Sequence, residues 1–293
     1  MTEFGGSVLP NISALWFIDC PDPAAELRAG AYIDPAATTD FMERAFTDAE
    51  LTPIGTSDLA AAVDGADNRV FVAHYGRLAV LAGTSLRTAD PHEMTSYLTD
   101  LGVGHTWALI SVDPGADIGG FARWEGGEVQ RAFFGTSSTI SVDVGLPYPF
   151  EGPFWAGGHP QRSPNQPLAL PFHPGALADA ANHAWFGFGF HETDPVVDPA
   201  LLPVTVYRIG PDDGRDGFVE SSVPLHVPTT AREPELAAAT AVPAAAETPP
   251  APTEGFGEYQ TEPIETVPAA APAAAEERTP GPLSRFFGFR GRL

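Results

Sequence analysis

Residues 105–144 contain four apolar segments in close succession: HTWALISV at 105–112, IGGFARW at 118–124, EVQRAFF at 128–134 and TISVDV at 139–144. Each segment is rich in β-branched and aromatic residues, which favour strands, and turn-forming residues separate them. Gly126-Gly127 fits a two-residue hairpin turn, because glycine adopts a positive φ without steric cost. This stretch predicts an antiparallel β-meander, and it decides the fold class.

The sequence on either side of the meander adds further strands and helices. Strands are expected at residues 12–18 (ISALWFI), 69–74 and 78–82 (a hairpin around Gly76), 204–209 and 218–223. Helices are expected at residues 22–46, 89–101 and 174–188. Helices and antiparallel strands in separate runs indicate an α+β fold. We therefore predict a largely antiparallel sheet with flanking helices, in one globular domain over residues 1–228.

The composition changes after residue 228. Of the 65 residues from 229 to 293, 15 are alanine and 10 are proline, and apolar anchors are few. Such a segment buries too little surface to offset its chain entropy. Residues 229–281 are therefore predicted to form a disordered, acidic Ala/Pro-rich linker.

The last twelve residues, 282–293 (PLSRFFGFRGRL), differ from this linker because they hold three arginines, three phenylalanines and no acidic residue. A basic and aromatic peptide on a long tether is typical of a docking motif. A protein partner is predicted for it, and weak contact with an anionic membrane is the other interpretation. The predicted partner-binding residues are Arg285, Phe286, Phe287, Phe289, Arg290 and Arg292.

The charge balance excludes several function classes. The 15 basic residues are all arginines and oppose 38 acidic residues, giving a formal charge of −23. Without lysine, neither a P-loop nor a Schiff-base mechanism is available, and an acidic body would repel nucleic acid. No apolar stretch reaches the roughly 18 residues of a membrane span, and the first 27 residues carry no basic side chain, unlike a secretory signal. A cytoplasmic location is expected.

A passage rich in proline and aromatic residues supplies the candidate catalytic groups. It comprises residues 149–160 (PFEGPFWAGGHP) and 170–174 (LPFHP). Glu151, His159 and His173 lie among large apolar side chains, where burial shifts pKa values as an acid/base site requires. The alternative is a packing loop, in which the aromatic side chains fill the core and the polar groups cap neighbouring elements.

Other polar residues carry weaker signals. The histidines, including His183 and His191, fit no ligand spacing, so neither a metal nor a cofactor is predicted. Cys20 follows the first strand and would be a nucleophile only if His74 or His105 reached it; a lone cysteine is more often a small buried hydrophobe.

Two arginines of the meander raise a separate question. Arg123 and Arg131 are expected on adjacent strands, where they pair with Glu125 or Glu128. The alternative is that they bind an anionic ligand together.

The passage at residues 149–160 and 170–174 resembles an uncharacterised actinobacterial family known as a domain of unknown function. The likeness extends over roughly residues 10–209 and is strongest at PFEGPFWAGGHP and LPFHP. The family has no established activity, so the resemblance implies a domain boundary and no reaction.

Two functions remain open from the sequence, and the oligomeric state is not indicated. The first is a non-catalytic protein-interaction module with a tethered C-terminal docking peptide. The alternative is a small-molecule enzyme with hydrolase-like acid/base catalysis by Glu151, His159 and His173. The residues alone do not decide whether the protein is an enzyme.

Overall fold

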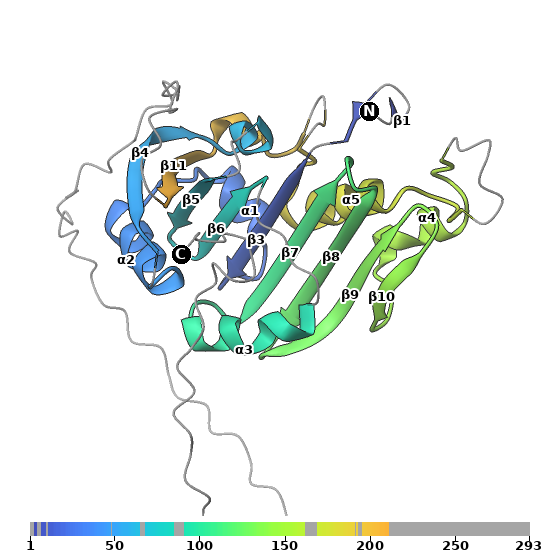
Figure 1. Cartoon of the computed structure of the whole chain (residues 1–293), viewed down its shortest axis with the longest axis horizontal. Coiled ribbons are helices and arrows are strands. Elements are labelled where there is room, and N and C mark those ends of the chain that lie inside the picture. Colours follow the sequence, from blue (N-terminus) through green and yellow to red (C-terminus); the bar gives the residue numbers. More distant parts are fainter. Residues whose placement is uncertain are drawn as a thin grey trace, which may run out of the picture. The chain divides into compact units, whose positions relative to one another are not determined.

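The predicted meander forms one half of a large antiparallel sheet (Figure 1). The computed structural model describes residues 3–4, 7–9, 11–47, 49–64, 68–84, 91–161, 169–190, 192 and 195–210. The meander consists of β7 (Thr106–Asp113), β8 (Ile118–Glu125), β9 (Glu128–Thr136) and β10 (Ile140–Val144). Gly126 and Gly127 both have positive φ, at 59° and 83°, and make the tight turn between β8 and β9 that the sequence predicts.

Five further strands complete the sheet. They are β3 (Ile12–Ile18), β4 (Leu51–Asp58), β5 (Arg69–Tyr75), β6 (Leu78–Gly83) and β11 (Pro203–Ile209). Among the described residues the sheet has nine strands in the order β10-β9-β8-β7-β3-β6-β5-β11-β4, and all neighbours are antiparallel. Near the N-terminus, β1 (Glu3–Phe4) and β2 (Ser7–Val8) form a separate two-stranded ribbon.

Helices cover both faces of the sheet (Figure 1). On one face, α2 (Pro35–Ala45) and α3 (Pro91–Leu101) pack over alternate side chains of the strands, such as Leu15 and Phe17 of β3. On the other face, α1 (Pro23–Arg28) and α5 (Pro174–Phe186) pack over the intervening residues, such as Trp16. Burial on both faces explains why β3 and β6 are apolar, apart from Ser13, and do not alternate with polar residues.

Short helical segments connect these elements. They are η1 (Leu59–Asp64), η2 (Pro149–Glu151), α4 (Gly152–Trp155) and η3 (Pro199–Leu201). The segments η2 and α4 belong to the proline-rich passage, where the many prolines predict no regular helix or strand. They bring that passage against β9 and α5, and this arrangement positions Glu151.

The structure corrects two expectations. The helix expected at residues 22–46 is two helices, because Gly30 takes a positive φ of 113° and Asp34 then caps the start of α2. The sequence does not predict strand β4 (LTPIGTSD), since Pro53 and Gly55 are poor strand residues. It lies at the edge of the sheet, where a proline is tolerated.

Several predictions concern residues outside those described. The strand expected at 218–223, the linker at 229–281 and the terminal peptide at 282–293 all follow Gly210, the last described residue. The α+β class, the antiparallel sheet and the flanking helices are confirmed over the described residues.

Candidate functional site

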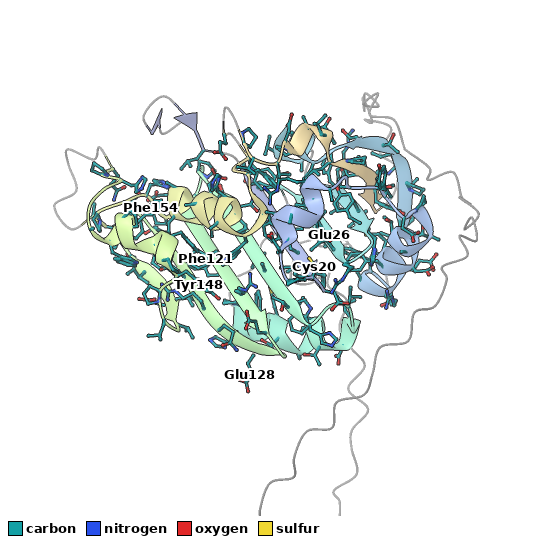
Figure 2. All side chains as sticks on the ribbon, turned by 180° about the vertical axis from the view of Figure 1, so that it is seen from behind. Cys20, Glu26, Phe121, Glu128, Tyr148 and Phe154 are labelled. Carbon is teal, nitrogen blue, oxygen red and sulfur yellow. The ribbon has the colours of Figure 1, made fainter. Side chains whose placement is uncertain are left out.

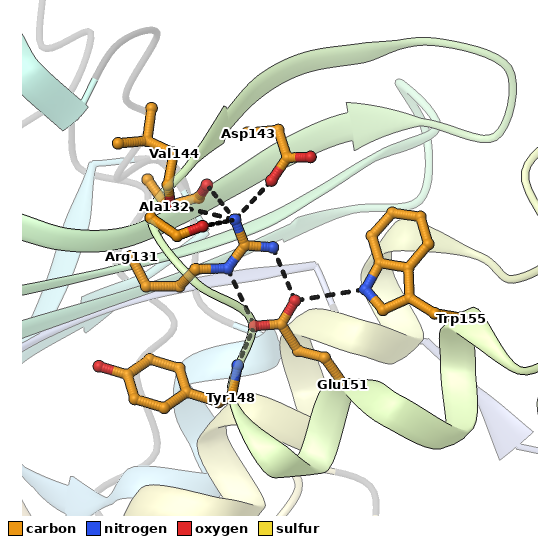
Figure 3. Close-up of polar contacts among 8 residues, drawn as sticks. Arg131, Ala132, Asp143, Val144, Tyr148, Glu151 and Trp155 are labelled. Atoms are coloured by element: carbon orange, nitrogen blue, oxygen red, sulfur yellow. Dashed lines mark hydrogen bonds and ion pairs between the residues drawn. The ribbon is translucent and has the colours of Figure 1, made fainter.

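The Glu151 carboxylate forms a buried, two-pronged ion pair with Arg131 of β9 (Figure 3). The guanidinium Nε donates to Oε1 at 3.0 Å, and Nη2 donates to Oε2 at 2.7 Å. The Arg131 side chain is 1% exposed and that of Glu151 is 0% exposed. Parallel hydrogen bonds of this kind are the strongest arrangement available to an arginine and a carboxylate.

The remaining hydrogen-bonding capacity of both groups is also used. Oε1 of Glu151 accepts from the backbone N–H of Tyr148 at 2.8 Å, and Oε2 accepts from the indole N–H of Trp155 at 3.4 Å. Nη1 of Arg131 donates to the carboxylate of Asp143 and to the backbone oxygen of Val144, the latter at 3.0 Å. Burial lowers the pKa of Arg131, but its bonds to Glu151 and Asp143 outweigh that effect and raise it.

This arrangement corrects the expected partner of Arg131. Arg123 does pair with Glu125, with Nε donating to Oε1 at 3.2 Å. Arg131 lies directly opposite Arg123 in the β8–β9 ladder, but it pairs with Glu151 and Asp143. The reason is that η2 brings an acidic side chain into the apolar layer beside Phe133, where an unpaired guanidinium would be costly to bury.

The second candidate, His173, caps the first turn of α5. Its Nδ1 accepts from the backbone N–H of Gly175 at 3.0 Å, and its Nε2 lies 3.0 Å from Oδ1 of Asp117. The ring is 2% exposed, and burial lowers its pKa although Asp117 opposes that shift. The imidazole is therefore neutral at pH 7, with its proton on Nε2 facing the carboxylate. Neither ring nitrogen is left to accept a proton from a substrate.

Asp117 joins His173 to the rest of the sheet. It follows the β7 strand and is the only described residue other than glycine with a positive φ, at 58°. Its carboxylate also accepts from the backbone N–H of Ser137 at 3.1 Å and from the Ser137 hydroxyl. The group thereby holds the β7–β8 turn, the β9–β10 turn and the start of α5 together.

The third candidate, His159, is exposed and has a different environment. Its ring stacks on Phe154 with centroids 4.0 Å apart and an interplanar angle of 16°. Phe154 in turn contacts Phe172 edge to face. Figure 2 shows Phe121, Tyr148 and Phe154 in the aromatic layer between the sheet and the segments that cover it. Glu151, His159 and His173 thus engage three different sets of partners.

A cleft of about 320 Å³ opens elsewhere, at the turn between β5 and β6. Arg77 of that turn, Arg44 of α2 and His74 of β5 line it, together with Asp19, which follows β3. The α3–β7 loop, with Gly102 and Gly104 at positive φ, also contributes to its lining. None of Glu151, His159 and His173 lines this cleft.

The His74 side chain, which lines this cleft, has one unsatisfied ring nitrogen. Its Nδ1 is buried and has no hydrogen-bond partner in the described part of the chain. Burial lowers the pKa of His74, Arg44 lowers it further, and Asp34 opposes both. The imidazole is therefore neutral at pH 7 and able to donate or accept one further hydrogen bond.

Comparison with known proteins gives one match. The model of a family of unknown function, DUF6928, matches residues 12–207. The chain belongs to the DUF6928 family. No curated protein and no solved structure matches it.

The DUF6928 match contains the buried ion pair, both candidate histidines and the residues of the cleft. The predicted partner-binding residues, Arg285 to Arg292, lie beyond the match and outside the described residues. Within residues 3–210, as far as these are described, no three His, Cys, Asp or Glu side chains gather as metal ligands would, and no helix is long and apolar enough to cross a membrane.

The structure also shows the environments of two further polar residues of the DUF6928 domain, Cys20 and His183. Burial and the nearby Glu26 raise the pKa of Cys20, while Arg77 opposes them, so the thiol form is favoured over a nucleophilic thiolate. Nδ1 of His183 lies 2.7 Å from Oε2 of Glu192, and His191 lies outside the described residues.

Sequence reasoning missed the cleft for a physical reason. The polar residues of the cleft lie on three different elements, so no sequence motif links them. They are Arg44 on a helix, His74 on a strand and Arg77 in a turn. The one available signal is the position of Asp19 directly after the strand at residues 12–18 (β3).

Proposed function

We propose that this protein is a non-catalytic interaction module. The DUF6928 domain is its acidic body, and the C-terminal peptide docks on a protein partner. The predicted contacts are Arg285, Phe286, Phe287, Phe289, Arg290 and Arg292. The preferred partner surface has an apolar groove flanked by carboxylates, since it must accept three phenyl rings and three guanidinium groups.

The observation that carries this proposal is the contrast in charge along the chain. Residues 1–228 contain 29 acidic residues and 10 arginines, a formal charge of −19, whereas residues 282–293 contain three arginines and no acid. Arginine and aromatic side chains contribute most of the binding energy at many protein interfaces. The Ala/Pro-rich residues between them provide a tether, which raises the effective concentration of the peptide near a partner already in contact with the body.

The contacts of the candidate catalytic groups favour this proposal over the enzyme alternative. Both carboxylate oxygens of Glu151 face the Arg131 guanidinium, and both nitrogens of His173 are hydrogen-bonded. Acid/base catalysis by Glu151 and His173 would require breaking buried interactions before a substrate proton is reached. Their present contacts are those of residues that hold a loop in place.

The proposal is tested by affinity capture with the full-length chain. Replacing Arg285, Arg290 and Arg292 by glutamine is expected to remove the partners that the parent retains. The matched control replaces Arg232 and Arg278, which lie in the linker, and is expected to retain them. Both variants should keep the parent's thermal midpoint. An identical set of partners for parent and terminal variant would overturn the proposal.

Two other results would also contradict it. Binding of the parent to phosphatidylserine vesicles, weakened by salt and lost in the terminal variant, with no protein partner retained, would indicate a membrane surface instead. A hydrolytic activity lost in Glu151→Gln and His173→Asn, with folding preserved, would support the enzyme alternative.

A further inference from the structure

The cleft beside the β5–β6 turn contains two guanidinium groups that have no carboxylate partner among the described residues. In the described part of the chain, neither Arg44 nor Arg77 forms an ion pair; Nε of Arg44 donates only to the backbone oxygen of Asp40, at 3.2 Å. Arg123 and Arg131, by contrast, each have a carboxylate partner. In a body that carries 29 acidic residues, two such arginines lining one cleft are an uncommon arrangement.

A third polar group adds to this site. His74 of β5 lines the cleft together with the two arginines. Its buried Nδ1 has no hydrogen-bond partner in the described residues. Buried polar atoms are almost always hydrogen-bonded, so a lone one requires an explanation. The His74 side chain therefore has hydrogen-bonding capacity that the described residues do not use.

We propose that this cleft binds a small molecule through an oxyanion, either a phosphate or a carboxylate group. Arg44 and Arg77 donate to the oxyanion, as guanidinium groups do in two-pronged contacts, and His74 supplies a further donor. The volume of about 320 Å³ suits a small metabolite. This site lies within the DUF6928 match and is independent of the C-terminal docking peptide.

Asp19 restricts which chemical groups the ligand can carry besides its oxyanion. Its backbone N–H donates to the oxygen of Arg77 at 2.9 Å, which fixes the start of the β3–α1 connection against the turn. Because the residue lines the same cleft, its carboxylate repels a second anionic group and accepts from a hydroxyl or ammonium group. The preferred ligand is therefore a molecule with a single oxyanion group that also carries a hydrogen-bond donor.

The test measures thermal unfolding and calorimetric binding of the full-length chain with inorganic phosphate and, separately, with acetate. Sodium chloride at the same ionic strength is the reference. One of the two anions is expected to raise the midpoint above the chloride value, and the effective one assigns the oxyanion. Arg44→Gln and Arg77→Gln should each weaken its binding by about tenfold or more, since each removes a charged hydrogen bond.

The matched control is Arg28→Gln. Arg28 is likewise exposed on a helix and its Nε likewise donates to a backbone oxygen four residues earlier, that of Ala24, at 3.2 Å. It should bind the anion as the parent does. The inference is overturned if neither anion stabilises the parent beyond chloride, or if all three variants lose binding equally.

Discussion

Arg131 and the pair Arg44 and Arg77 show two opposite uses of arginine in one domain. Arg131 is 1% exposed and donates to two carboxylates and to backbone oxygens. Arg44 and Arg77 are exposed and have no carboxylate partner among the described residues. A buried charge must be compensated by other groups within the fold. An exposed charge is solvated by water, which a ligand can replace.

The largest effect is expected from breaking the buried pair. Glu151→Leu leaves the Arg131 guanidinium without its main partner, which should lower the free energy of unfolding by about 3–5 kcal/mol. Urea denaturation measures it. The control is Glu125→Gln, because the Arg123–Glu125 pair is half exposed and should contribute under about 1 kcal/mol. Equal losses in both variants would remove the distinction between the two kinds of arginine.

Replacing both partners should recover most of that loss. In the variant Arg131→Met with Glu151→Leu, no charge remains buried, and the apolar side chains fill the space beside Phe121 and Phe133. The double variant is expected to be more stable than Glu151→Leu by roughly 2–4 kcal/mol. A double variant no more stable than Glu151→Leu would show that the ion pair stabilises the position of η2, in addition to compensating a buried charge.

The third prediction concerns pH. Burial lowers the pKa of His173 below 6.5, so the unfolded chain binds more protons than the folded one as the pH falls. The stability due to neutral His173 is present above pH 6.5 and is lost as the pH drops below it. His74 acts in the same direction.

His173→Asn separates the two histidines. Asparagine is a favourable N-cap, so the variant retains a cap for α5 but has no titrating ring. Denaturation at several pH values should show a shallower loss of stability below pH 6.5 than in the parent, with the contribution of His74 retained. The exposed His159→Gln is the control and should follow the parent. An unchanged slope in His173→Asn would contradict the assignment.

The smallest effect is expected at the cleft. Arg44→Gln and Arg77→Gln should change the free energy of unfolding by at most about 0.5 kcal/mol in the absence of ligand, because both side chains are exposed and neither forms an ion pair with a described residue. The same urea titration checks this. A loss above 1 kcal/mol in either variant would mean that the arginine has a structural role, as Arg131 does.

The elements that follow from local pattern were predictable, and those that depend on distant contacts were not. The meander and the β5–β6 hairpin follow from apolar segments separated by Gly126-Gly127 and Gly76. The split between α1 and α2 depends on the backbone of Gly30, and β4 depends on a partner strand about 150 residues later.

The candidate sites show the same limit. Glu151 and His173 were singled out because they are polar residues in apolar surroundings. Their roles depend on Arg131 and Asp117, which no local pattern connects to them. The cleft was not predictable, because Arg44, His74 and Arg77 come from three elements with no spacing in common.

The position of β11 affects how the domain can fold during synthesis and where it can be truncated. This strand is inserted between β4 and β5, and residues Thr205 to Arg208 pair with both neighbours. A growing or truncated polypeptide that stops before Pro203 therefore separates β4 from the sheet and leaves the edge of β5, with the apolar Val70 and Val72, open to other chains. The smallest fragment worth expressing extends through Ile209, two residues past the end of the family match.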